Sequence, residues 1–216
     1  MTIGEIARKI LGNYFPVIAR GYRLFFVDLS AVAHSISPYI TQGAIIVDIG
    51  GGDGELLNHL LALRSDIRVK MIDRSTCIGG SIKKEYLSRV ELFPGISMGE
   101  FNKADAQKTD VILISDVLHH VPAEERKEFF CGLRALACGQ HEMSIIIKDI
   151  EPGSLRASLS RMADRYISGD KNVTLIGRVD LSRMVSDAFG NTVEVTETNL
   201  FTINKPNYAQ VYLCRN

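Results

Sequence analysis

The chain has 216 residues, which is within the size range of a single sizeable domain. Its composition, 46% hydrophobic and 23% charged, is typical of a soluble globular protein and argues against disorder across the whole chain. The 25 basic and 25 acidic residues give a net charge of zero, which argues against broad electrostatic binding to nucleic acid, because such binding needs an excess of positive charge.

Two helices are predicted at the N-terminal end, over residues 3–12 and 16–35. Residues 1–40 are interpreted as a helical cap over the site of the domain that follows, residues 41–216. The apolar segment 14–36 contains Arg20, Arg23 and Asp28, and a helix lying on a membrane surface is an alternative interpretation. No run reaches the roughly 18 uncharged apolar residues that span a bilayer, so no transmembrane segment is expected.

The segments that follow alternate between strand and helix patterns. Short apolar runs predict strands buried on both faces of a sheet, at residues 44–50, 67–73, 90–93, 110–115 and 143–150. Helical spacing predicts helices at residues 54–63, 75–87, 122–138, 153–168 and 179–189. Two late runs, 192–198 and 208–214, alternate in polarity and predict an antiparallel pair at one edge. This order predicts a doubly wound α/β domain with a mostly parallel sheet.

The four cysteines are scattered along the chain without CxxC spacing, at Cys77, Cys131, Cys138 and Cys214. This spacing predicts neither a zinc site nor a disulfide framework. We expect reduced thiols in a cytoplasmic protein.

The stretch "VDIGGGDGE", residues 47–55, passes from a predicted strand through four glycines into a predicted helix. Glycine permits unusual backbone angles and lets a ligand approach the main chain closely. In an open parallel sheet, ligands bind at the carboxyl ends of the strands. The position of the glycine loop therefore predicts a nucleotide-like cofactor.

Two common cofactor motifs do not fit this loop. The dinucleotide motif GxGxxG would need a glycine at Glu55, and no Lys-Ser or Lys-Thr pair follows as in the phosphate loop. Asp48, Asp53 and Glu55 also surround the loop with negative charge. That charge suits a cationic ligand better than a pyrophosphate.

The glycine loop resembles the first motif of the class I S-adenosylmethionine-dependent methyltransferases, and the resemblance extends from about residue 44 to the C-terminus. It implies a Rossmann-like, seven-stranded, mostly parallel sheet with one antiparallel strand, and S-adenosylmethionine as cofactor. Four loop residues are then expected in the cofactor site, namely Asp48, Gly50, Gly52 and Gly54.

Later segments match further cofactor motifs of this family. Asp73, with Arg74 beside it, follows the second strand, where the family has an acid for the ribose hydroxyls; a carboxylate can accept both hydroxyl protons. The resemblance also implies that Glu100 and Phe101 frame the adenine, although Glu100 replaces the more usual aspartate. Ser115 and Asp116, after the fourth strand, are expected at the methionine end of the cofactor.

The stretch "DVLHHVP" resembles the VLHDW-type segment of small-molecule O-methyltransferases, in which the first histidine is the general base. That role falls on His119, while His120 replaces the family's aspartate or asparagine and is expected in the acceptor pocket. Asp149 is the candidate that orients His119, with Glu151 as an alternative. A histidine is suited to removing a hydroxyl proton near neutral pH.

Other interpretations of these residues stay open. His119 could only pack or cap the turn, and His120 could form part of the pocket wall. Asp116 and Asp149 could together hold Mg²⁺, but oxygen sites need more ligands than the sequence offers, and no metal is expected.

Arg161 and Arg165 lie four residues apart on a predicted helix face. They could receive an anionic acceptor. Because acidic residues are interleaved with the basic ones in this region, a solvated helix face is the alternative.

The expected function is transfer of a methyl group from S-adenosylmethionine to a small-molecule acceptor, at oxygen, with His119 as base. The alternatives are N- or C-methylation that relies on proximity alone, and a catalytically silent protein that binds the cofactor as a partner or scaffold. No nucleic-acid partner is expected, because the neutral charge counts against RNA methylation. The sequence leaves both a monomer and a homodimer open.

Overall fold

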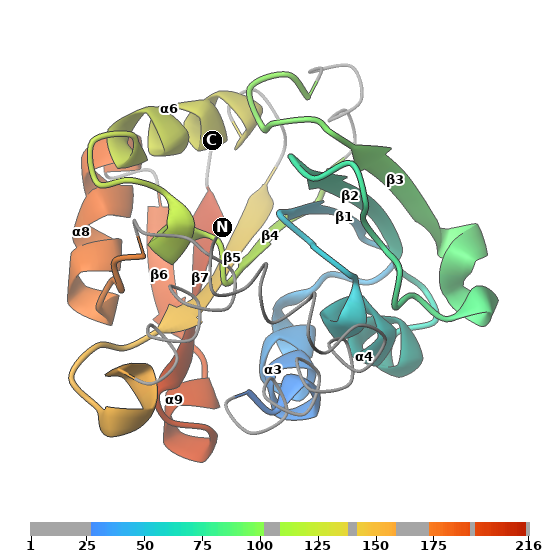
Figure 1. Cartoon of the computed structure of the whole chain (residues 1–216), viewed down its shortest axis with the longest axis horizontal. Coiled ribbons are helices and arrows are strands. Elements are labelled where there is room, and N and C mark those ends of the chain that lie inside the picture. Colours follow the sequence, from blue (N-terminus) through green and yellow to red (C-terminus); the bar gives the residue numbers. More distant parts are fainter. Residues whose placement is uncertain (1–26, 102–108, 138–141, 159–172, 191–192, 215–216) are drawn as a thin grey trace, which may run out of the picture.

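The computed structural model describes residues 27–101, 109–137, 142–158, 173–190 and 193–214 (Figure 1). The predicted helix over residues 3–12 and most of the one over 16–35 lie outside these residues. The described part of the second helix is α3 (Leu29–Ile36), which begins where the Asp28 side chain accepts a hydrogen bond from the Ala31 N–H at 3.0 Å. It is followed by a short 3-10 helix, η2 (Ser37–Tyr39).

Seven strands form one sheet in the order β3-β2-β1-β4-β5-β7-β6. They are β1 (Ile45–Ile49), β2 (Arg68–Asp73), β3 (Val90–Pro94), β4 (Val111–Ser115), β5 (Met143–Ile150), β6 (Val193–Glu197) and β7 (Asn207–Cys214). All neighbours are parallel except at β7, which is antiparallel to both β5 and β6. The predicted seven-stranded, doubly wound α/β fold with one antiparallel strand is therefore confirmed.

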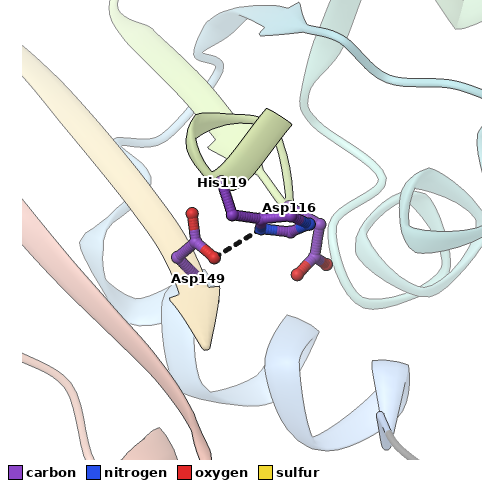
Figure 2. A group of neighbouring side chains, drawn as sticks. All are labelled: Asp116, His119 and Asp149. Atoms are coloured by element: carbon purple, nitrogen blue, oxygen red, sulfur yellow. Dashed lines mark hydrogen bonds and ion pairs between the residues drawn. The ribbon is translucent and has the colours of Figure 1, made fainter. Parts of the chain in front are cut away.

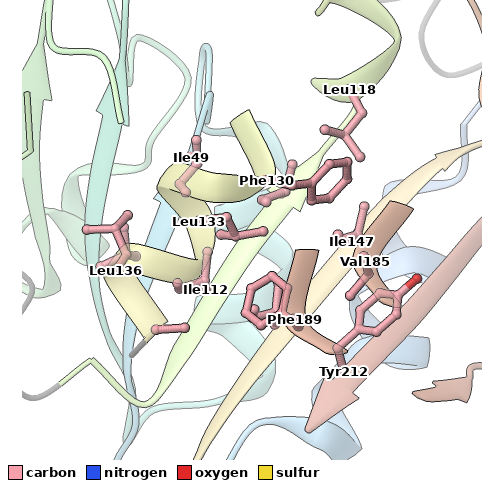
Figure 3. Close-up of a cluster of buried hydrophobic side chains, with 14 of the residues drawn as sticks. Ile49, Ile112, Leu118, Phe130, Leu133, Leu136, Ile147, Val185, Phe189 and Tyr212 are labelled. Atoms are coloured by element: carbon pink, nitrogen blue, oxygen red, sulfur yellow. The ribbon is translucent and has the colours of Figure 1, made fainter. Parts of the chain in front are cut away.

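Helices cover both faces of the sheet (Figure 1). On one face, α6 (Arg126–Ala137) and α8 (Arg178–Phe189) pack on side chains such as Ile112 of β4 (Figure 3). On the other face, α3 and α4 (Glu55–Leu63) pack on the intervening residues, such as Leu113. Successive strand residues point to opposite faces of the sheet, so an apolar strand without alternation contributes buried side chains to both faces.

The predicted helix over residues 75–87 is wrong. The segment begins with turns and ends in the 3-10 helix η3 (Lys84–Arg89). Gly79 has a φ of +68° that a helix does not permit, and its N–H donates to the Gly52 carbonyl at 2.9 Å. The turns thus pack beneath the glycine loop, a tertiary contact that overrides the local helical pattern.

Three smaller differences concern the other helices. The helix predicted from Pro122 begins at Arg126, after a turn over residues 123–125. A four-residue helix, α9 (Leu200–Ile203), joins β6 to β7 and was not predicted. Of the helix predicted over 153–168, the described residues include only the helical turn 155–158.

The described part of the N-terminal cap lies against the sheet rather than apart from it. Val32, Ala33 and Ile36 of α3 are fully buried in the same apolar cluster as α4. Closure of the cap over the site remains a prediction, because residues 1–26 lie outside the described part. None of the described helices combines the length and the apolar character needed to cross a membrane.

Candidate active site

The sheet reverses its winding direction between β1 and β4. From β1 the chain continues outward through β2 and β3, and then returns to place β4 on the other side of β1. The carboxyl ends of the strands at such a reversal form the crevice in which doubly wound folds bind ligands. In this protein, a cavity of about 930 Å³ lies there, lined by the ends of β1 and β2, residues 96–99, residues 116–122 in part, and α6.

The glycine loop forms one edge of this cavity. Gly50 has a φ of +72° and donates its N–H to the Ile72 carbonyl at 2.8 Å. A Cβ atom at Gly50 would collide with the Val117 side chain on the cavity wall. Gly54 begins α4 at a φ of +80°, and a Cβ atom there would collide with Ile82. Gly50 therefore permits the close approach of Val117 at the cavity wall, whereas Gly54 permits the close approach of Ile82 behind it.

Asp73, at the end of β2, lies on the cavity wall with its carboxylate fixed by backbone donors. Its two oxygens accept hydrogen bonds from the Gly52 N–H at 2.9 Å and the Ser75 N–H at 2.8 Å. Each carboxylate oxygen has a further lone pair for a ligand hydroxyl. Arg74 lines the cavity beside it. The hydrogen bond between Gly52 and Asp73 thus links the glycine loop to the end of β2.

Asp48 of β1 lies behind the glycine loop, with its carboxylate against the backbone of Gly51. Burial, and to a smaller extent the negative charge of Asp73, raise the pKa of Asp48 from 3.8 to about 7. A nearby ligand cation would favour the charged form of Asp48. Asp48 is therefore the carboxyl of this site that titrates near neutral pH.

The folded protein is expected to lose stability as the pH rises from about 4 to 7, because over that range folded Asp48 keeps a proton that the unfolded chain has released. The unfolding free energy should fall by about 1 kcal/mol per pH unit from this group. Urea unfolding of the wild type and of Asp48→Asn at several pH values measures the effect, since the variant should lack this slope. Equal slopes in the two proteins would rule out the assignment.

Six of the ten predicted cofactor residues are not among the described residues of the cavity wall: Asp48, Gly52 and Gly54, which belong to the glycine loop and the strand before it, and Glu100, Phe101 and Ser115. Glu100 is exposed, and its carboxylate accepts hydrogen bonds from the N–H and hydroxyl of Ser97, which lower its pKa. Phe101 is in the core, edge-to-face with Phe93 at 5.3 Å between ring centres. Residues 96–99 form the wall instead, and Ser115 donates to Asp116 from behind it.

The side chains of His119 and Asp149 point toward each other from neighbouring segments of the chain (Figure 2). The Nδ1 atom of His119 lies 2.6 Å from Oδ1 of Asp149, and both side chains are buried. The same oxygen accepts the Ile150 N–H at 2.8 Å. Because a carboxylate can only accept, Nδ1 carries a proton, and in the neutral ring Nε2 then carries the lone pair. The backbone supports this arrangement, since the His119 carbonyl accepts the Thr174 N–H at 2.9 Å.

The two adjacent histidines occupy different environments. His120 lines the cavity, whereas His119 is only 2% exposed and is not among the described residues of the wall. Their rings lie 4.3 Å apart, so His119 is directly behind His120. The alternative partner, Glu151, faces another way, because its carboxylate accepts the Arg178 N–H at 2.9 Å.

Asp116, His119 and Asp149 form a group whose candidate ligand atoms lie within 4.8 Å of one another. The Lys148 ammonium already donates to both oxygens of Asp116, at 2.6 and 2.7 Å. A metal ion at this position would therefore face the lysine's positive charge at short range, and three ligands are fewer than Mg²⁺ prefers. The arrangement favours proton transfer over metal binding.

The sequence interpretation missed the contribution of α6 and the turn before it. Glu125, Glu128, Phe129 and Gly132 line the cavity together with Cys131. Their spacing of three and four residues places most of them on one helix face, which was a detectable signal. The predicted acceptor residues Arg161 and Arg165 lie outside the described residues.

Comparisons of sequence yield no relative. No protein-family model matches the chain, and no curated protein matches it by sequence. Comparisons of structure do find relatives. The N,N-8-amino-8-demethyl-D-riboflavin dimethyltransferase of Streptomyces davawensis is 13% identical, with a TM-score of 0.71 over 100% of this chain and 62% of its own. A mitomycin 7-O-methyltransferase is 18% identical, with a TM-score of 0.61 over 87% of this chain and 53% of its own.

A third structure resembles the chain over nearly its own whole length. The 1,6-didemethyltoxoflavin-N1-methyltransferase of Burkholderia thailandensis, solved with its substrate and S-adenosylhomocysteine, is 12% identical, with a TM-score of 0.65 over 100% of this chain and 92% of its own. By contrast, the chain spans only 55–62% of the length of several other structures it matches. At such low identity the likeness concerns architecture: the chain has the Rossmann-like fold of the class I S-adenosylmethionine-dependent methyltransferases.

Proposed function

We propose that the protein transfers a methyl group from S-adenosylmethionine to a small-molecule acceptor, at oxygen, with His119 as the general base. The observation that carries the proposal is the hydrogen-bonded pair of His119 and Asp149 directly behind a cavity that the glycine loop and Asp73 border. The solved structures of the same fold include O- and N-methyltransferases of small molecules, which supports the reaction class.

The residues at the cavity fit this cofactor. Asp73 offers fixed carboxylate oxygens to a ribose, and Gly50 and Gly52 let a ligand approach the backbone. Asp73 supplies negative charge, which suits a cation, and a bound cation would favour the charged form of Asp48. Bound S-adenosylmethionine supplies an electrophilic methyl carbon on a sulfonium, which is a good leaving group. The role of the chain is then to align the acceptor and to exclude water.

His119 is suited to remove the proton of an acceptor hydroxyl. Its Nδ1–H is held by Asp149, so Nε2 is the basic atom, and Asp149 stabilises the imidazolium that forms. His120 belongs to the wall of the pocket in this proposal. Arg161 and Arg165 remain candidates for binding an anionic group of the acceptor.

N-methylation is the second candidate. It is favoured by the low exposure of His119, 2%, because an amine acceptor with a free lone pair needs alignment but no base. In that case the two histidines only shape the pocket. A dependence of the rate on His119 separates the two reactions.

Calorimetry with S-adenosylmethionine and S-adenosylhomocysteine tests the shared premise. We expect saturable binding of both, because the contacts proposed for Asp73 and the glycine loop do not involve the transferred methyl group. A screen of metabolites with tritiated methyl donor then identifies the acceptor class. A folded protein that binds neither compound would contradict both reactions.

A further inference from the structure

Lys148 is a fully buried cation in the middle of the sheet. It lies on β5, which pairs with β4 on one side and β7 on the other, and its side chain is 0% exposed. Its ammonium donates to both carboxylate oxygens of Asp116 at 2.6 and 2.7 Å. Removing an ammonium ion from water is costly unless an opposite charge compensates it. Asp116 supplies that charge.

Asp116 is held in an unusual backbone conformation. Its φ is +59°, and within the described ranges it is the one residue other than glycine with a positive φ. Such a conformation persists only where the surroundings enforce it, and it is concentrated at functional sites. The contacts that enforce it come from Lys148, whose ammonium binds the side chain and whose carbonyl accepts the Asp116 N–H at 3.0 Å.

The carboxylate fixed in this way faces His119. Candidate ligand atoms of Asp116, His119 and Asp149 lie within 4.8 Å of one another, so the imidazole has a carboxylate on each side (Figure 2). Burial raises the pKa of Asp116, but the attraction of Lys148 and then that of His119 hold this pKa below its usual value. By reciprocity, any uncompensated charge on Asp116 favours the imidazolium form of His119.

Three other charged or titratable groups of the described chain lie near this histidine: His120, Arg126 and Tyr208. His120, also on η4 (Leu118–His120), has its ring tilted against that of His119 at 4.3 Å between ring centres. Arg126 of α6 donates to the carbonyls of Val121 and Thr174, and its positive charge attracts Asp149. Tyr208 of β7 is buried, and its hydroxyl donates to the Ile176 carbonyl; burial and then Asp149 raise its pKa far above neutral. Lys148 is thus the cation bonded directly to the second carboxylate beside His119.

We propose that Lys148 is a positioning residue of the active site: its ammonium fixes and neutralises Asp116, so that His119 acts against one carboxylate, Asp149, rather than two. Two uncompensated carboxylates would keep the imidazole protonated and unable to accept a proton at neutral pH. The inference rests on the proposed function for its catalytic meaning. The experiment that tests it measures the titration of His119 and needs no methyl acceptor.

The experiment is an NMR titration of the side chains in histidine-labelled protein. The chain has five histidines, and the His119 resonances are assigned by their loss in His119→Ala. We expect Lys148→Met to raise the titration midpoint of His119 by about one pH unit, the lower end of the effect of an adjacent opposite charge. In Lys148→Met/Asp116→Asn, where both charges are removed, the midpoint should return close to that of the wild type.

Two further variants serve as controls. Lys127→Met removes the same charge from the exposed surface of α6 and should leave the midpoint unchanged. If Lys148→Met does not fold, Lys148→Gln carries the same prediction, because its amide can still donate to Asp116. A purely structural role for Lys148 would lower the unfolding free energy but leave the midpoint in place, and that result overturns the proposal.

Failure of this inference is distinguishable from failure of the proposed function. If His119→Ala transfers methyl groups normally, the base assignment is lost even when the titration midpoint responds to Lys148. If the midpoint does not respond, the role of Lys148 is lost whatever the activity of His119→Ala.

Discussion

The His119→Ala variant is expected to transfer methyl groups about 10²–10⁴-fold more slowly than the wild type, the usual contribution of a positioned general base. Asp149 holds Nδ1 at 2.6 Å, so the substitution removes a base whose orientation is already fixed. The rate, measured with tritiated methyl donor and the acceptor found by screening, should fall through kcat. The wild-type rate should rise with pH through the range in which histidine titrates, and this acidic limb should disappear in the variant.

Controls separate chemistry from folding. His59→Ala replaces a half-buried histidine on α4 and should keep the wild-type rate. Cofactor affinity of His119→Ala, measured by calorimetry, should also stay close to that of the wild type. Asp149→Asn should slow the reaction as well, because an amide no longer enforces the proton on Nδ1. Normal turnover by His119→Ala would remove the base assignment and leave N- or C-methylation, in which the histidines only shape the pocket.

The Asp73→Ala variant is expected to bind S-adenosylhomocysteine about 10²-fold more weakly than the wild type. Two hydrogen bonds from ribose hydroxyls to a carboxylate contribute about 1.5 kcal/mol each, and 1.4 kcal/mol corresponds to a tenfold change in affinity. Calorimetry measures the loss directly. The bonds from Gly52 and Ser75 hold the carboxylate in place before any ligand arrives, so little reorganisation opposes binding.

The same two bonds also stabilise the loop, so the experiment must separate the roles of Asp73. A 2′,3′-dideoxy analogue of S-adenosylhomocysteine lacks the hydroxyls. The wild type should bind it about as weakly as Asp73→Ala binds the parent compound, and the variant should bind both alike. Glu91→Ala, at an exposed carboxylate on the neighbouring strand, serves as the charge control. If Asp73→Ala bound S-adenosylhomocysteine with unchanged affinity, the Asp73 carboxylate would stabilise the loop without binding the ligand.

The strands and the position of the glycine loop beside the cavity followed from local patterns. Apolar runs such as "AIIVDIG" and "DVILIS" have the period and length of strands buried on both faces, and these patterns do not depend on distant contacts. Glycine at position 50 is demanded by a backbone angle, so it is visible in the sequence. The adenine motif assigned to Glu100 and Phe101 was less reliable. Glu100 fits by its place in the chain, but the backbone turns after Pro94 and presents residues 96–99 to the cavity.

The sequence by itself predicted the seven strands, most of the helices, and the glycine loop with Asp73, because each depends on residue type and spacing along a short segment. The helix predicted over residues 75–87 and the unpredicted α9 are exceptions. The candidacy of His119 and Asp149 came from the resemblance to small-molecule O-methyltransferases. Only the tertiary structure decided that Asp149 rather than Glu151 contacts the histidine, that His120 and α6 line the cavity, and that Lys148 neutralises Asp116. These facts depend on which way side chains turn at neighbouring strand ends, and the packing of residues far apart in the chain fixes that direction.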